Sequence, residues 1–152
     1  MVRYETTAVI FASDEQVWNV LADVARWHEW TPTITRVEPL DSEPFNTGSR
    51  FRVAQPRLRP AVWTVTESTP PKGFTWESRS AGMYMAAEHS IRPRSEHECQ
   101  VMLRMTFSGL LGNVIGRLYK NLTENYLAQE VATLKQHIET TVCDHQQCHF
   151  YR

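Results

Sequence analysis

The sequence lacks any long apolar run. The longest apolar stretch near its start, from Ala8 to Ala12, is far shorter than the about 20 residues that span a bilayer, and it is too short for the hydrophobic segment of a secretory signal. An excess of either charge is also missing, because 16 basic and 17 acidic residues give a formal net charge of -1. No global field therefore attracts nucleic acid or anionic lipid. We expect a cytoplasmic protein with no membrane span and no nucleic-acid partner.

Cysteine is scarce. Cys99, Cys143 and Cys148 form an odd set in a chain of 152 residues, which is long enough to bury a core without disulfide bonds, so we predict none. The segment 143–149 contains four soft-metal ligands, Cys143, His145, Cys148 and His149. Structural zinc sites usually take their ligand pairs from two separated segments. We therefore interpret this segment as part of a flexible tail and predict no metal site.

The signatures of several enzyme classes are absent as well. Gly109, Gly112 and Gly116 are not followed by the Gly-Lys-Ser/Thr of a phosphate loop, so we expect them to serve turns and close packing. The sequence has neither a Gly-x-Ser-x-Gly elbow nor a His-Glu-x-x-His zinc motif. We predict no nucleotide.

What the chain does contain is the composition of one folded domain, with 41% hydrophobic and 22% charged residues. β-Branched and aromatic residues over 3–11 predict a first strand. Ser13 and Gln16 then have the spacing of a capping box, which predicts a short helix over 14–22. A second short helical segment is expected from Asp23 to Trp30, ending before Pro32.

Short strand-like runs separated by turn residues follow. They predict antiparallel strands near 34–40, 49–55, 61–68, 73–79, 84–92 and 98–108. Apolar residues spaced mostly by three and four then predict one long helix over about 113–139. We expect an α+β domain over 1–140, in which a curved antiparallel sheet of about seven strands wraps around this helix, and a flexible tail over 141–152.

This order of elements resembles the helix-grip fold of the START-related (SRPBCC) superfamily, and within it the polyketide cyclase/dehydrase and lipid-transport group. The resemblance extends over residues 2 to 140. It is carried by five local matches: Ala12-Ser13-Asp14-Glu15-Gln16-Val17-Trp18, Trp27-His28-Glu29-Trp30, Phe74-Thr75-Trp76, Glu88-His89-Ser90-Ile91 and Phe107-Ser108-Gly109-Leu110-Leu111. It implies a cavity between sheet and helix that holds a hydrophobic small molecule such as a lipid, a polyketide or an aromatic compound, without a fixed cofactor. A monomer and a homodimer are both compatible with it.

Large apolar and aromatic residues on the inward faces of the predicted elements are typical of such a cavity, although the same residues would also fill an ordinary core. The predicted lining consists of Trp27, Trp30, Phe51, Val53, Phe74, Trp76, His89, Ile91, Leu103, Met105, Phe107, Leu118, Leu122 and Tyr126. Further candidate polar donors are Tyr84, Tyr119 and Asn125.

His89 is the candidate catalytic residue. Strand alternation puts it on the same face as Ala87 and Ile91, and family members often have a histidine at this place. A neutral imidazole there could orient a ligand carbonyl or abstract a proton next to one, whereas the alternative is a hydrogen-bonded core histidine. Relatives with this histidine often carry an acidic residue in the last strand, but the segment 103–107 has no carboxylate.

Three functions remain open from the sequence. The first is binding or carriage of a hydrophobic small molecule. The second is a polyketide cyclase/dehydratase-type enzyme that uses His89. The third is a protein or RNA interaction module with a filled core.

Overall fold

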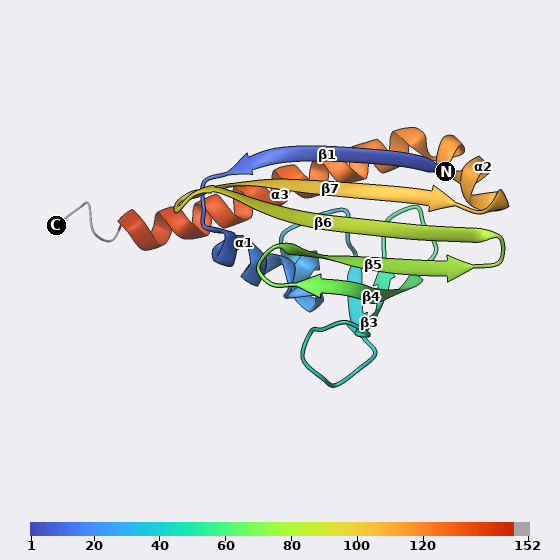
Figure 1. Cartoon of the computed structure of the whole chain (residues 1–152), viewed down its shortest axis with the longest axis horizontal. Coiled ribbons are helices and arrows are strands. Elements are labelled where there is room, and N and C mark those ends of the chain that lie inside the picture. Colours follow the sequence, from blue (N-terminus) through green and yellow to red (C-terminus); the bar gives the residue numbers. More distant parts are fainter. Residues whose placement is uncertain (148–152) are drawn as a thin grey trace.

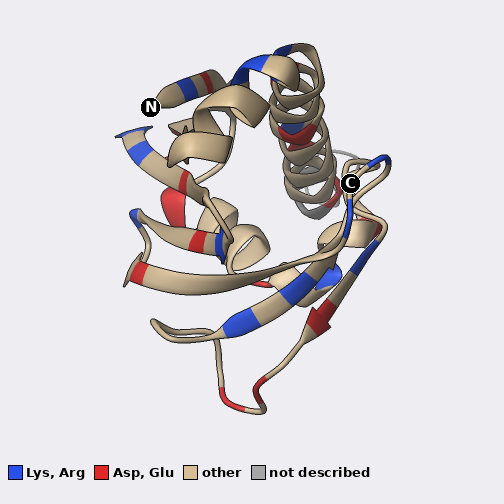
Figure 2. Cartoon of the chain, turned by 90° about the vertical axis from the view of Figure 1, so that its right-hand side faces the viewer, with Lys and Arg blue, Asp and Glu red and all other residues tan. Residues whose placement is uncertain are grey.

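The computed structural model describes the backbone of residues 1–147 and the side chains of residues 1–144. Seven antiparallel strands form one sheet in the order β1-β7-β6-β5-β4-β3-β2 (Figure 1). The strands are β1 (Val2–Ile10), β2 (Arg36–Pro39), β3 (Arg50–Ala54), β4 (Ala61–Thr69), β5 (Gly73–Ser80), β6 (Met83–Ser95) and β7 (Glu98–Ser108). The sheet is curved, and the long C-terminal helix lies on its concave face (Figure 2). The expected α+β helix-grip architecture is therefore confirmed.

Two short helical segments connect β1 to β2. Helix α1 (Asp14–Leu21) begins at the predicted capping box, since the Ser13 hydroxyl accepts from Gln16 N at 3.2 Å and the Gln16 side chain accepts from Ser13 N at 2.9 Å. The 3₁₀ helix η1 (Val24–Glu29) follows at once. The two capping-box bonds satisfy the backbone N–H groups of Ser13 and Gln16, which fixes the start of α1.

The prediction of a single helix over 113–139 is wrong. The chain forms two helices, α2 (Leu110–Leu118) and α3 (Lys120–Gln147), separated at Tyr119. The hydroxyl of Tyr4 donates to Gly116 O at 2.8 Å, and Leu111 N donates to Gly82 O at 2.9 Å, so α2 is held at the end of the sheet. Helix α3 instead packs along β1 and β7. The apolar spacing continues through the break, which is why the sequence did not reveal it.

Helix α3 also continues beyond the predicted end at 139. Residues 141–147 of the predicted tail are helical, and residues 148–152, including Cys148 and His149, lie outside the described residues. None of the helices in the described part of the chain is long and apolar enough to cross a bilayer.

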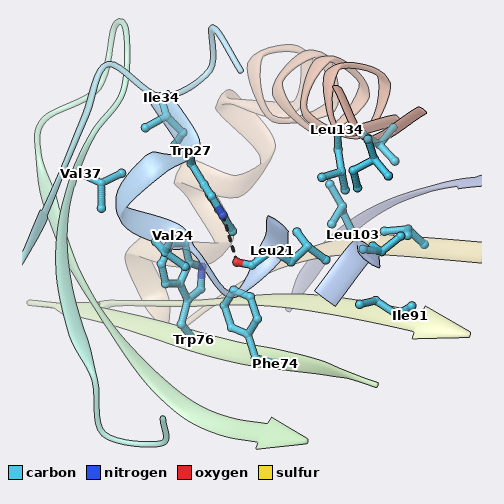
Figure 3. Packing of buried hydrophobic residues seen from close by; sticks show 14 of the residues in the cluster. Leu21, Val24, Trp27, Ile34, Val37, Phe74, Trp76, Ile91, Leu103 and Leu134 are labelled. Carbon is cyan, nitrogen blue, oxygen red and sulfur yellow. Dashed lines mark hydrogen bonds between the residues drawn. The ribbon is translucent and has the colours of Figure 1, made fainter. Parts of the chain in front are cut away.

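The packed core lies where α1 and η1 meet the sheet and α3 (Figure 3). Trp27 is buried at its centre, and its indole N–H donates to Leu21 O at 3.0 Å. Its ring centroid lies 6.2 Å from that of Phe74 and 5.2 Å from that of Trp76. These aromatic contacts fill one part of the space between the sheet and α3, and a cavity lies beside them.

Candidate ligand cavity

A cavity of about 640 Å³ lies between the sheet and the helices α2 and α3. One wall comes from strands β3 to β7 and the other from α2 and the first part of α3. The loop between β3 and β4 completes it, together with Trp27 of η1 and Ile34. Its apolar lining residues are Trp27, Ile34, Val53, Leu58, Pro60, Ala61, Val62, Trp63, Trp76, Met83, Met85, Ala87, Leu103, Met105, Phe107, Ile115, Leu122 and Leu127. A space of this size and lining is typical of a site for a small organic molecule.

Three tryptophans form the aromatic part of the wall. Trp76 on β5 lies centrally, with its ring centroid 5.2 Å from that of Trp27 and 5.5 Å from that of Trp63. Strand alternation explains the arrangement, because Trp63 and Val65 on β4 and Trp76 and Ser78 on β5 are buried together on the inner face. The wall therefore offers broad, rigid aromatic surface to a ligand.

His89 lies on β6, lines this cavity, and is only 5% exposed. Its ring stacks on that of Phe74, with centroids 4.2 Å apart and 16° between the planes. Nδ1 lies 3.3 Å from the carbonyl oxygen of Phe74. A carbonyl oxygen can only accept, so this bond requires the proton on Nδ1 and leaves Nε2 as an acceptor. Burial lowers the pKa of His89 to about 4, partly offset by this hydrogen bond, so the imidazole is neutral at pH 7.

Glu130 is a cavity residue that the sequence analysis missed. Its carboxyl on α3 lines the cavity, and among the described residues it has no hydrogen bond or ion pair. Burial alone raises the pKa of Glu130 to about 7. The sequence does contain a signal for this residue, because Glu130 interrupts a row of apolar residues spaced by four. The row is Leu122, Tyr126, Glu130, Leu134 and Ile138.

The polar groups near the β3–β4 loop are largely engaged. The Tyr126 hydroxyl donates to Pro56 O and thereby joins α3 to this loop. The side chain of Gln55 donates to Thr33 O at 3.2 Å. Arg59 and Arg79 also line the cavity and are exposed. Tyr126 therefore lines the cavity, and its hydroxyl also anchors the β3–β4 loop to α3.

Arg104 occupies the last strand close to the place where the acidic residue of relatives was expected. Its guanidinium forms ion pairs with Glu5 at 2.9 Å and with Glu88 at 3.0 Å. These three residues face each other across β1, β7 and β6 in the strand register. Glu88 on β6 lines the cavity as the partner of Arg104, so the unpaired carboxyl group of the cavity comes from α3 and not from β7.

The structure brings most of the predicted lining residues together. Those at the cavity are Trp27, Val53, Trp76, His89, Leu103, Met105, Phe107, Leu122 and Tyr126. Phe51, Phe74 and Ile91 lie in the packed core instead. Leu118 is 76% exposed, because the break at Tyr119 separates α2 from α3. Trp30 stacks on His137 over a separate shallow depression, with ring centroids 6.3 Å apart.

The three other candidate donors are divided in the same way. Tyr119 lines the cavity. Tyr84 instead lies beneath the guanidinium of Arg79, 4.8 Å from its ring centroid, and Asn125 accepts a hydrogen bond from Gln129 on α3. Within the described part of the chain, no three His, Cys, Asp or Glu side chains are grouped so that they could hold a metal ion.

A family model described as "Polyketide cyclase / dehydrase and lipid transport" matches residues 1–139. Solved structures of the same fold include the Zhui aromatase/cyclase from Streptomyces sp. R1128, with 18% identity, a TM-score of 0.75, and coverage of 92% of this chain and 94% of that one. A START superfamily protein from Mycobacterium smegmatis has 15% identity and a TM-score of 0.71, with coverage of 93% and 99%.

Norcoclaurine synthase from Thalictrum flavum has 11% identity and a TM-score of 0.71, with coverage of 90% of this chain and 92% of that one. No curated protein matches the sequence. At these identities the structural likeness shows the fold.

Proposed function

Because the chain belongs to the polyketide cyclase/dehydrase and lipid transport family, we propose that it binds or carries a hydrophobic small molecule in its internal cavity. The observation that carries this proposal is the cavity of about 640 Å³ with its largely apolar lining. A ligand that buries about 300 Å² of apolar surface gains roughly 7 kcal/mol at about 25 cal/mol per Å² before ordering costs. Burial alone is thus sufficient for useful affinity.

The first experiment is native mass spectrometry of the freshly purified protein, followed by denaturing extraction of anything released. A co-purifying hydrophobic molecule at one copy per chain is the expected result. A clean apo mass, followed by failure of apolar probes to bind in calorimetry, would contradict the proposal.

A second candidate function is catalysis of the cyclase/dehydratase type. The observation in its favour is that two titratable groups, neutral His89 and the carboxyl of Glu130, line the same cavity. An imidazole with a free Nε2 can accept a proton next to a carbonyl, and a carboxyl group whose pKa is near 7 can donate or accept one. Glu130 thus offers the acid that the last strand lacks.

A His89→Ala variant separates the two candidates. A carrier keeps most of its ligand affinity in this variant, because burial provides the binding energy. An enzyme loses turnover by about 100-fold or more, because a general base is removed.

The third alternative, an interaction module, required a filled core, and the cavity argues against it.

A further inference from the structure

Glu130 presents an unpaired carboxyl group to a largely apolar cavity. Its neighbours in the four-residue row, Tyr126 and Leu134, are respectively a wall residue and a core residue. An ionised carboxylate in such surroundings is costly unless a cation or several donors reach it. Among the described residues none does. The ionised form of this side chain is therefore stabilised by a cationic partner that enters the cavity.

The protein's own cations do not supply this partner. Arg104 is paired with Glu5 and Glu88. Arg79 lies over the ring of Tyr84 and 3.9 Å from Glu77. Arg59 is exposed on the β3–β4 loop and forms no ion pair with Glu130. The remaining titratable groups of the cavity are His89 and Glu88 on β6 and the two tyrosines, and none of these provides a cation at neutral pH.

The aromatic wall favours the same kind of ligand. The faces of Trp27, Trp63 and Trp76 carry the negative part of the indole quadrupole, which attracts a cation placed over the ring. His89 adds an acceptor at Nε2. A carboxylate, an imidazole acceptor and indole faces in one cavity all favour a positively charged nitrogen.

We propose that the cavity selects hydrophobic amines, and that Glu130 binds the protonated amine by a charge-assisted hydrogen bond. This inference rests on the proposed function, since it specifies the ligand class of the same cavity. Charge-assisted hydrogen bonds are about twice as strong as neutral ones, so the amine distinguishes this ligand from a neutral molecule of the same shape.

The experiment compares three probes of nearly equal size by isothermal titration calorimetry at pH 8. They are 2-naphthylmethylamine, 2-naphthylmethanol and 2-naphthoate. We expect the amine to bind about 10-fold more tightly than the alcohol, and the carboxylate to bind most weakly because Glu130 repels it. The Glu130→Gln variant should lose about 10-fold in amine affinity and keep its affinity for the alcohol.

Glu124→Gln is the matched control, because Glu124 lies on the same helix and is exposed. It should leave all three affinities unchanged. Equal binding of amine and alcohol to the wild type overturns the amine selection but leaves the binding proposal intact. Failure of all three probes to bind overturns both.

A measurement on the wild type alone keeps the test independent of how the variant folds. Burial raises the pKa of Glu130 to about 7, so the carboxylate is mostly protonated at pH 6 and mostly ionised at pH 8. Amine affinity should therefore rise about 10-fold from pH 6 to pH 8, while alcohol affinity stays constant. His89 stays neutral over this range, since its pKa is about 4. Alcohol binding that weakens with rising pH would instead assign Glu130 the role of a neutral donor and overturn the inference.

Discussion

His89 on β6 and Glu130 on α3 line one cavity from its sheet wall and its helix wall. Burial favours the neutral form of both side chains, and it therefore shifts their pKa values in opposite directions. The pKa of His89 is lowered to about 4, whereas the pKa of Glu130 is raised to about 7. Between pH 8 and pH 5 the two groups therefore have opposite effects on stability, and variants at each position separate them.

Replacing Glu130 with Gln should stabilise the protein at alkaline pH. The folded state binds the Glu130 proton more tightly than the unfolded state, so the stability linked to this group is lost as pH rises through about 7. We expect Glu130→Gln to raise the free energy of unfolding by about 2 kcal/mol at pH 8 and by little at pH 4.5. Urea denaturation at the two pH values measures this. An equal effect at both values would assign the gain to packing and not to ionisation.

Replacing His89 with Leu should reveal the opposite dependence. The neutral imidazole is favoured in the folded state, so the stability linked to this group is complete above about pH 6.5 and is lost as pH falls toward 4. From pH 8 to pH 5 the wild type should lose about 2 kcal/mol relative to His89→Leu. Urea denaturation of both proteins at the two pH values provides the measurement. Parallel curves would mean that the imidazole is not buried as a neutral group.

Two glycines of α2 make a matched pair for the packing of this helix. A methyl group at Gly116 would lie 2.9 Å from Cβ and 3.0 Å from Cγ of Phe107, so α2 would have to move. A methyl group at Gly112 would meet its nearest neighbours at 3.6 Å or more. We expect Gly116→Ala to cost about 1–3 kcal/mol by overpacking. Gly112→Ala should be neutral or stabilise by about 0.5–1 kcal/mol through helix propensity. Thermal unfolding compares the two, and equal effects would contradict the close packing of α2 on Phe107.

Local chemistry explains which parts of the fold were predictable. The capping box at Ser13 and the alternation of Val101, Leu103 and Phe107 depend on neighbouring residues, and the structure agrees with both. The break at Tyr119 depends on where the sheet ends and on how closely Gly116 approaches Phe107, which no local pattern contains.

The candidate site was predictable to a similar extent. Strand periodicity places Trp76 and His89 on the inner face, but it does not distinguish a side chain at the cavity from one in the core, as Phe74 and Ile91 illustrate. Glu130 lies within an apolar row and carries the charge that an amphipathic pattern normally assigns to solvent. Only the position of α3 over the sheet reveals that its carboxyl faces the cavity.

Ala87 offers a direct test of the cavity as the binding site. It lines the cavity on β6, between Trp76 and Met105 in the strand register, whereas the adjacent Ala86 does not line it. A phenyl ring at position 87 occupies space that a ligand needs, so Ala87→Phe should reduce the affinity for 2-naphthylmethanol by about 10-fold or more. Ala86→Phe introduces the same ring on the opposite face of the sheet and should leave affinity unchanged. Thermal unfolding of both variants separates loss of space from loss of fold, because a filled cavity keeps or raises the melting temperature. Equal affinities of the two folded variants would contradict binding in this cavity and direct the search to the surface.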